Sequence, residues 1–417
     1  MVSICFYFQV HQPERLRRYS VFDIGKTTAY FDDRKNKEVI EKVAKKCYLP
    51  MNALLLKLIT RHKGAFKVSF SISGTALDQF ERWAPEVLES FKALARTGCV
   101  EFMAETYYHS LSFLYSKEEF DKQVEMHSAK IKQLFDQKPN VFRNTELIFN
   151  NELAKHIQDK GFSAVLCEGA DHILGWRSPN FLYTSVTAPD IKLLLKNYKL
   201  SDDIAFRFSN KGWNEHPLTV EKFCRWLNAT NGNGNVVNLF MDYETFGEHQ
   251  WEDTGIFQFM DRLPGELLKH PDNDFKTPSE VAASYPPLGV LDIHNFISWA
   301  DLERDLSAWL GNPMQHGAID ELYRLRDAVM ASGNKEIIQD WKRLTTSDHF
   351  YYMCTKWFSD GDVHKYFNPY DTPYEGYIAF MNVLNDLALR TKTERQEEHG
   401  TTLTEHPSEI LATAKES

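Results

Sequence analysis

Short apolar runs alternate with longer amphipathic stretches along the first part of the chain. Runs of this length, rich in β-branched and aromatic residues, predict buried strands. They stand at residues 2–9, 66–72, 99–104, 140–145, 163–167, 203–208 and 236–241. Stretches with a helical pattern lie between them and include 38–62, 75–97, 118–136 and 150–160. This alternation predicts a parallel sheet with helices on its faces.

Seven predicted strands come close to the number in a closed α/β barrel. An open, doubly wound sheet would produce the same pattern, so the pattern alone leaves the closure of the sheet undecided. We assign the predicted sheet and its helices to one domain, residues 1–262.

The composition and the hydrophobic pattern of the sequence change after this domain. Residues 263–290 are rich in Pro, Gly, Asp and Ser, and we expect a loop-rich excursion over 263–298. Residues 299–346 and 372–392 have helical patterns and predict a C-terminal helical bundle, residues 299–392, which packs on the barrel and completes a cleft. Residues 393–417 are polar and lack aromatic side chains, which predicts a disordered tail.

Composition narrows the function. The formal charge of −10 and the pI near 5.9 argue against a nucleic-acid partner, because nucleic-acid binders carry basic surfaces. The apolar N-terminus lacks a basic start and a cleavage site, and no stretch of eighteen apolar residues exists, so we expect neither a signal peptide nor a membrane partner. The six cysteines are scattered and never form CxxC, which predicts reduced, buried thiols in a cytoplasmic protein.

Polar side chains follow several of the predicted strands directly. His11 follows the first strand, His109 comes shortly after the third, Glu146 follows the fourth, and Asp242 and Glu244 follow the last. In parallel α/β folds such positions converge at one edge of the sheet. Glycoside hydrolysis requires at least two carboxyl groups in a cleft. One attacks or stabilises the anomeric carbon, and the other carries a proton. The same carboxylates could instead cap helices or form ion pairs.

A catalytic metal is another reading of the acidic and histidine residues. Metal sites need two or three ligands at close spacing. His11 has no acidic neighbour, and Glu248, His249 and Glu252 stand in a predicted loop. We therefore expect neither a metal nor another cofactor.

Five segments of the chain resemble the motifs of glycoside hydrolase family 57, most closely its α-amylase group. They are HQP (11–13), GCVEFMAETYYHSL (98–111), FRNTEL (142–147), NLFMDYETFGEHQ (238–250) and SAWLGNPMQ (307–315). The resemblance implies a (β/α)₇ barrel followed by a helical region, and retaining chemistry on α-glucans. It also implies that Glu146 is the nucleophile and Asp242 the general acid/base.

The resemblance further implies that His11, His109, Glu244 and Trp309 contact the substrate. The alternative for Trp309 is the core of the helical region, and we expect Trp341, Trp357, Tyr351 and Tyr352 in that core. The expected function is an α-amylase that cleaves α-1,4-glucosidic bonds, with starch, glycogen or maltooligosaccharides as its partner. A 4-α-glucanotransferase, a branching enzyme and a non-catalytic glucan-binding protein on the same scaffold are the alternatives. The sequence predicts no oligomeric state.

Overall fold

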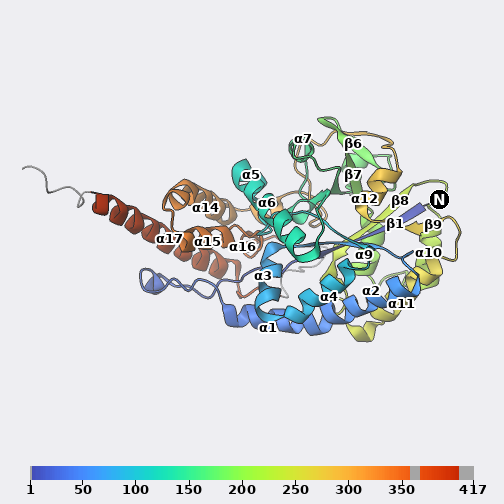
Figure 1. Cartoon of the computed structure of the whole chain (residues 1–417), viewed down its shortest axis with the longest axis horizontal. Coiled ribbons are helices and arrows are strands. Elements are labelled where there is room, and N and C mark those ends of the chain that lie inside the picture. The colour runs from blue at the N-terminus through green and yellow to red at the C-terminus, as the bar shows by residue number, and fades with distance from the viewer. Residues whose placement is uncertain (1, 357–366, 403–417) are drawn as a thin grey trace, which may run out of the picture.

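The structure is a computed structural model that describes residues 2–356 and 367–402. One sheet joins all the strands of this part of the chain (Figure 1). They are β1 (Val2–Val10), β2 (Val68–Ile72), β3 (Val100–Phe102), β4 (Val141–Arg143), β5 (Ala164–Glu168), β6 (Tyr183–Ser185), β7 (Ala188–Lys196), β8 (Val236–Asp242), β9 (Asn273–Phe275) and β10 (Gly289–Leu291).

Seven of these strands form a closed parallel barrel. The pairs β1–β2, β2–β3, β4–β5, β5–β7, β7–β8 and β8–β1 are all parallel. The remaining junction, β3 to β4, is a parallel bridge between Ala104 and Phe142, in which the Arg143 amide donates to the Ala104 carbonyl at 2.9 Å. The bridge and the hydrogen bond between β3 and β4 close the ring, so the sheet is not open. The prediction of a barrel is therefore confirmed.

The barrel strands are buried on both faces, which explains their nearly continuous apolar sequences. All nine residues of β1 are buried. Cys5 and Tyr7 pack with the side chains inside the barrel, whereas Phe6 and Phe8 pack with residues of the surrounding helices. Each such aromatic or aliphatic side chain contributes about 1.5–3 kcal/mol when fully buried.

Helices surround the barrel, with α1 to α4 and α11 below the strands and α6 and α7 above them in Figure 1. The helices of this part are α1 (Asp33–Val43), α2 (Leu49–Arg61), α3 (Gly74–Trp83), α4 (Pro85–Ala95), α5 (Ser112–Tyr115), α6 (Lys117–Phe135), α7 (Asn151–Asp159), α8 (Asp171–Leu174), α9 (Tyr198–Ala205), α10 (Val220–Asn228) and α11 (Ile256–Leu267). A π turn, η2 (Ala44–Tyr48), joins α1 to α2, so the stretch predicted at 38–62 is helical but not uniform.

The strand predicted at 203–208 is wrong. Residues 203–205 end helix α9, whose N-cap Asn197 accepts a hydrogen bond from the amide of Leu200. The missing barrel strand is β7, which contains Asp190, Lys192 and Lys196. These charged residues hide its strand character, because Asp190 is exposed while Lys192 and Lys196 bury their stems and find partners for their ammonium groups.

The segment 263–290 is more regular than the loop-rich excursion predicted there. Strand β9 pairs in parallel with β1, and β10 pairs with β6. Between them lies α12 (Pro278–Ser284), which begins with a capping box formed by Thr277 and Glu280. The Pro and polar residues that suggested a loop are thus partly the start signals of a helix.

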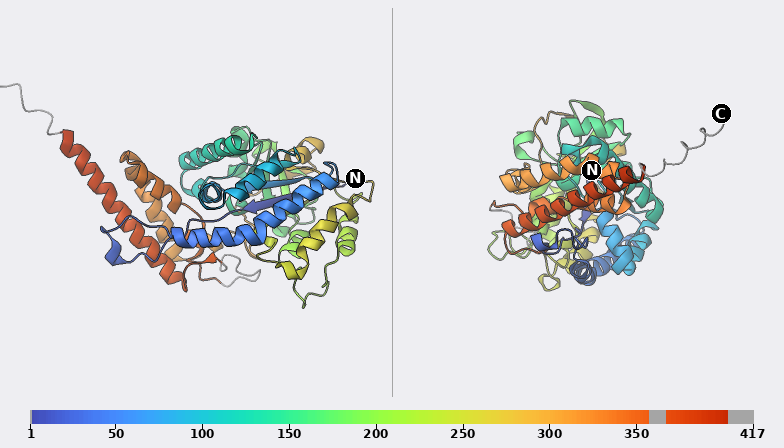
Figure 2. Two further views of the ribbon diagram at one scale, coloured as in Figure 1. Left: turned by 60° about the horizontal axis from the view of Figure 1, so that its bottom comes forward. Right: turned by 90° about the vertical axis from the view of Figure 1, so that its left-hand side faces the viewer.

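The helical C-terminal region is confirmed. It contains α13 (Ser307–Leu310), α14 (Pro313–Ala331), α15 (Lys335–Leu344), α16 (Asp348–Tyr351) and α17 (Pro373–Thr402). These helices share one apolar cluster, in which Trp341 is fully buried, and lie beside one end of the barrel (Figure 2). Because α17 continues to Thr402, the prediction of disorder is wrong for 393–402. Residues 403–417 and Trp357 lie outside the described residues.

Two further findings concern the cysteines and the character of the helices. Five of the six cysteines are buried, as expected, and Cys354 is half-buried. In the described residues, no helix combines the length and the apolar character that a membrane crossing requires.

Candidate active site

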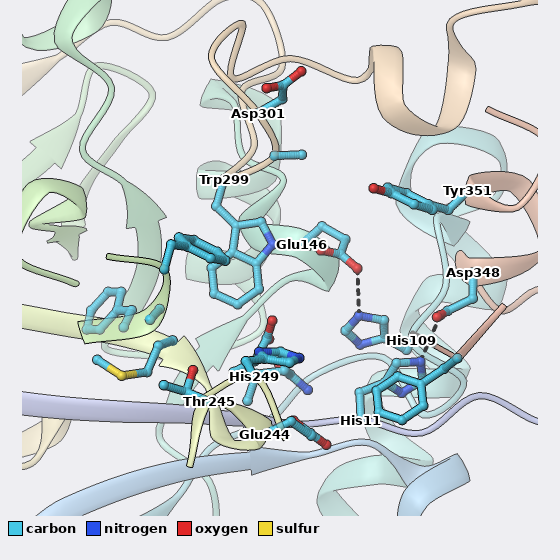
Figure 3. A pocket seen from close by; sticks show the side chains of 18 of the residues that line it. His11, His109, Glu146, Glu244, Thr245, His249, Trp299, Asp301, Asp348 and Tyr351 are labelled. Atoms are coloured by element: carbon cyan, nitrogen blue, oxygen red, sulfur yellow. Dashed lines mark hydrogen bonds and ion pairs between the residues drawn. The ribbon is translucent and has the colours of Figure 1, made fainter. Parts of the chain in front are cut away.

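A pocket opens at the carboxyl ends of the barrel strands (Figure 3). All six predicted site residues line it. Five come from the barrel and its loops, and one comes from the helical region. The six are His11, His109, Glu146, Asp242, Glu244 and Trp309. The chain brings them together because all parallel strands end at the same rim.

Glu146 stands on a short turn that directly follows β4, η3 (Thr145–Leu147). Its φ is +56° and that of Leu147 is +53°, a left-handed conformation that costs non-glycine residues free energy. The carboxylate has one N–H group on each oxygen. His109 Nε2 lies 3.2 Å from Oε1, and Trp299 Nε1 donates to Oε2 at 2.6 Å. The turn and these two donors together fix where the carboxylate points.

His109 connects Glu146 to a second buried carboxylate. Its Nδ1 lies 2.8 Å from Glu105 Oε2. Burial alone would lower the pKa of His109, but the hydrogen bonds with Glu105 and Glu146 raise it to about 9. Burial would likewise raise the pKa of Glu105, but His109 holds it at about 2. The two directions agree, so at neutral pH His109 is a cation between two carboxylates.

His11 ties the first strand to the helical region. Its Nδ1 lies 2.7 Å from the Ser73 hydroxyl, and its Nε2 lies 2.9 Å from Asp348 Oδ2. Burial and the neighbouring His109 charge lower the pKa of His11. A second link holds the two parts together, because the amide of Ser347 donates to the His109 carbonyl at 3.0 Å.

Asp242 and Glu244 enter the pocket from the end of β8. Asp242 is the last residue of the strand and is half-buried. Glu244 is buried, and its Oε1 accepts hydrogen bonds from the Tyr48 hydroxyl and, at 3.3 Å, from Gln12 Nε2. Burial and the nearby Asp242 charge raise the pKa of Glu244 to about 8. Glu244 is therefore a neutral acid at neutral pH.

Trp309 has both of the positions considered for it. It lines the pocket, yet its side chain is fully buried within the apolar cluster of the C-terminal helices. Its ring lies 6.2 Å from that of Tyr351, centroid to centroid. The indole Nε1 has no hydrogen-bond partner among the described residues.

Several pocket residues were not predicted from the sequence. They are Asp348 and Tyr351 of α16, Trp299 and Asp301 of the loop before α13, and Lys196, Asp202 and His249. Lys196 Nζ donates to Asp202 Oδ1 at 3.0 Å. Asp348 offered one usable signal, because it is an acid inside the aromatic run that the sequence assigns to a core. Among the described residues, no group of three or more His, Cys, Asp and Glu side chains is arranged to hold a metal ion.

A closed parallel barrel with several carboxylates at the ends of its strands defines a (β/α)₇-barrel enzyme whose site is built for acid and base chemistry. Residues 5–294 match the sequence model of glycosyl hydrolase family 57, and the chain belongs to this family of glycoside hydrolases. The matched span ends before Trp309, so its assignment to the fifth motif stays a prediction.

A relative from Methanocaldococcus jannaschii supports the α-amylase group within the family. This protein, named "Putative alpha-amylase", is 47% identical over 403 residues, which are 93% of this chain and 85% of the relative.

Solved structures share the fold at low identity. The 4-alpha-glucanotransferase from Thermococcus litoralis superposes with a TM-score of 0.65 at 16% identity, and the match covers 84% of this chain but 56% of that enzyme. A family 57 branching enzyme from Pyrococcus horikoshii also gives a TM-score of 0.65, at 13% identity and with 98% of each chain covered. At these identities the likeness concerns the fold alone.

Proposed function

We propose that this chain is a retaining α-amylase, with Glu146 as the nucleophile and Asp242 as the general acid/base. The observation that carries the proposal is the position of the Glu146 carboxylate and the hydrogen bonds that hold it. Its carboxylate lines the pocket with an N–H donor on each oxygen, while Asp242 lines the same pocket from β8. A carboxylate whose oxygens accept hydrogen bonds from an imidazolium and an indole is held in its ionised form, which a nucleophile requires.

In the first step, Asp242 donates to the glycosidic oxygen the one proton that the Asp242 and Glu244 pair holds at neutral pH, while Glu146 attacks the anomeric carbon. The bond between that carbon and the leaving oxygen breaks, and a bond to the Glu146 carboxylate forms through an oxocarbenium-like transition state. The shortened glucan leaves as an alcohol, and a covalent glycosyl-enzyme remains.

In the second step, Asp242 accepts a proton from water as the water oxygen attacks the same carbon. The bond to Glu146 breaks, and the product leaves with its α configuration retained. Asp242 is then protonated again and ready for another cycle. The same residue serves as acid and as base because each step reverses the proton transfer of the other.

The remaining polar groups suit a neutral, hydroxyl-rich substrate. Glu244, as a neutral carboxyl, can both donate and accept, and the buried pair of Lys196 and Asp202 adds further hydrogen-bonding atoms to the wall. Tyr351 and Trp309 line the pocket from the apolar cluster of the helical region. The proposed substrates are α-1,4-linked chains such as starch, glycogen and maltooligosaccharides.

The test is incubation of the purified chain with maltoheptaose, followed by separation of the products, alongside Glu146→Gln and Asp242→Asn. We expect only shorter maltooligosaccharides from the wild-type protein. We expect a loss of at least about a thousandfold in rate for the Glu146 variant, because the covalent route needs the carboxylate. The anomer released first, followed by proton NMR, should be α.

Glu101→Gln is the matched control. Glu101 is a carboxyl outside the pocket that accepts hydrogen bonds from the amide and hydroxyl of Ser279. It undergoes the same chemical change without touching the site, so its rate should stay near that of the wild-type protein. Products longer than the substrate would replace the hydrolase with a glucanotransferase. A Glu146→Gln variant that turns over normally would reject the nucleophile assignment.

A further inference from the structure

Trp299 contacts Glu146 at both ends of the residue. Its backbone amide donates to the Glu146 carbonyl at 3.1 Å, and its indole Nε1 donates to the carboxylate Oε2 at 2.6 Å. Figure 3 shows the indole beside the carboxylate, on the other side from His109. One residue of the loop before α13 thus bonds through its backbone to the turn of Glu146 and through its side chain to the reactive carboxylate. A residue that only walled the pocket would not need both contacts.

Two buried cations lie against the ring of Trp299. The Arg143 guanidinium carbon is 4.9 Å from the ring centroid and Lys196 Nζ is 5.3 Å from it. Lys196 is paired with Asp202. Arg143 is different, because its side chain is fully buried and none of its three guanidinium nitrogens has a hydrogen-bond partner among the described residues. A buried cation without hydrogen-bond partners lowers the stability of a fold, so its position against this ring calls for a functional reason.

The loop that carries Trp299 is held in a costly conformation. Asp301 has a φ of +51° and Arg304 a φ of +52°. The Arg304 guanidinium donates to the Trp299 carbonyl at 2.5 Å, and the Ser298 amide donates to the Arg304 carbonyl at 3.1 Å. Such strain persists only where surrounding contacts determine it, and it concentrates at functional sites.

We propose that Trp299, backed by the Arg143 cation, is a positioning residue that orients the Glu146 carboxylate and keeps it ionised for attack. A cation on the face of an indole draws on its π electrons, which strengthens the N–H group as a donor. A stronger donor on Oε2 stabilises the ionised carboxylate. Trp299 and Arg143 then act through Glu146, without a bond to the substrate. The proposal rests on Glu146 as the nucleophile of the proposed function.

Trp299→Phe separates the N–H group from the ring, because phenylalanine keeps an aromatic face over Arg143 and loses only the donor and part of the ring. With an aryl α-maltoside as the substrate, we expect kcat to fall about ten- to hundredfold and KM to change by less than about threefold, as loss of one hydrogen bond to a charged group predicts. The acid limb of the pH profile of kcat/KM should move to higher pH, since the ionised carboxylate loses a donor. An unchanged kcat, or a fall with an unmoved acid limb, would overturn the role of Trp299.

Arg143 provides a second variant with the opposite expectation for stability. Arg143→Met removes a buried charge that has no hydrogen-bond partner and keeps a similar volume, so the variant should melt at the same temperature as the wild-type protein or higher. Its kcat should nevertheless fall and its acid limb should move in the same direction as in Trp299→Phe. Arg143→Lys, which keeps the charge, should restore part of the rate. A slower Arg143→Met enzyme with an unmoved acid limb, or a variant with full activity, would overturn the role of Arg143.

The indole N–H group gives a readout that needs no activity. In the ¹⁵N-labelled protein, which has nine tryptophans, the Trp299 indole signal is the one lost in Trp299→Phe. It should lie far downfield, as expected for a charge-assisted hydrogen bond, and move upfield in both Glu146→Gln and Arg143→Met. An unmoved signal in these variants would overturn the proposal. This measurement is independent of turnover, so it tests the role of Trp299 and Arg143 alone. The maltoheptaose assay with Glu146→Gln tests the proposed function separately, so the failure of one can be distinguished from the failure of the other.

Discussion

His11 and His109 stack face to face beneath the pocket, with ring centroids 3.9 Å apart and planes inclined by 17°. Their pKa values move in opposite directions. Burial would lower the pKa of His109, but its hydrogen bonds with Glu105 and Glu146 raise it to about 9, whereas burial and the His109 charge lower the pKa of His11. The stack is therefore one imidazolium against one neutral imidazole at neutral pH. The stacked pair therefore places one positive charge, not two, beside the proposed nucleophile.

The first prediction concerns the loss of His109 stabilisation at high pH. The folded-state pKa of about 9 lies above the unfolded value of about 6.5, so the stabilising contribution of protonated His109 is complete below about pH 6.5 and is lost as the pH rises through about 9. Melting temperatures of the wild-type protein and His109→Gln should differ most near pH 6. The gap should narrow by about pH 10. A gap of constant size would contradict a raised pKa for His109.

Glu105 predicts the corresponding effect at low pH. Burial would raise its pKa, but His109 lowers it to about 2, below the ordinary value of 4.5. The stabilisation from ionised Glu105 is therefore present above about pH 4.5 and is lost as the pH falls toward about 2. Near neutral pH, Glu105→Gln should cost about 3–5 kcal/mol, because it leaves the His109 charge buried without its partner. Urea unfolding at a series of acidic pH values measures this, and a cost that does not shrink on acidification would rule out the ionised pair.

Glu244 predicts a pH effect of the opposite sign. Burial and the Asp242 charge raise its pKa from 4.5 to about 8, so the folded state holds a proton that the unfolded state releases. Stability is therefore lost as the pH rises from about 4.5 to about 8. In Glu244→Gln the amide oxygen can still accept from Tyr48 and Gln12, and no proton is held. This variant should gain stability relative to the wild-type protein as the pH rises through that window.

Differential scanning calorimetry between about pH 5 and pH 8 would measure the gain. Glu86→Gln, at an exposed carboxyl in the first turn of α4, serves as the control for the chemical change alone. A difference between Glu244→Gln and the wild-type protein that stays flat with pH would show that Glu244 is ionised throughout.

The fold could be predicted where strand sequences are apolar throughout, and not where charged residues enter the barrel. Strand β1 is buried at all nine positions, and its sequence alone indicates a parallel strand. Strand β7 carries Asp190, Lys192 and Lys196, and its true character depends on tertiary partners such as Asp202 and the carbonyl of Ala282. The local sequence pattern holds no information about these partners. The predicted strand at 203–208 therefore fell on the end of helix α9, and β7 was missed.

The site shows the same division. Glu146 and Asp242 follow strands directly, so the convergence of parallel strands predicts that they share a pocket. Asp348 and Trp299 come from segments far along the chain, and they reach the pocket only through contacts such as that between the Ser347 amide and the His109 carbonyl. The role of Arg143 could not be predicted from the sequence for another reason. Within a strand, arginine gives no sign that it will be buried against an indole.

The last prediction compares two fully buried tryptophans in the C-terminal helical cluster. Trp341 Nε1 donates to the Leu322 carbonyl at 2.8 Å, whereas Trp309 Nε1 has no hydrogen-bond partner among the described residues. Both lose similar ring volume on change to phenylalanine, but only Trp341→Phe also loses a hydrogen bond. Trp341→Phe should therefore reduce the free energy of unfolding by about 1 kcal/mol more than Trp309→Phe.

Urea unfolding with equal m-values measures this difference. Trp309→Ala gives the size of the packing contribution, and it should cost about 3–5 kcal/mol because Trp309 is core as well as pocket wall. Equal costs for the two phenylalanine variants would mean that the Trp309 N–H group has a partner in solution, such as an enclosed water molecule. A cost near zero for Trp309→Ala would instead mean that Trp309 belongs to the wall alone, since removal of a core tryptophan always leaves a cavity.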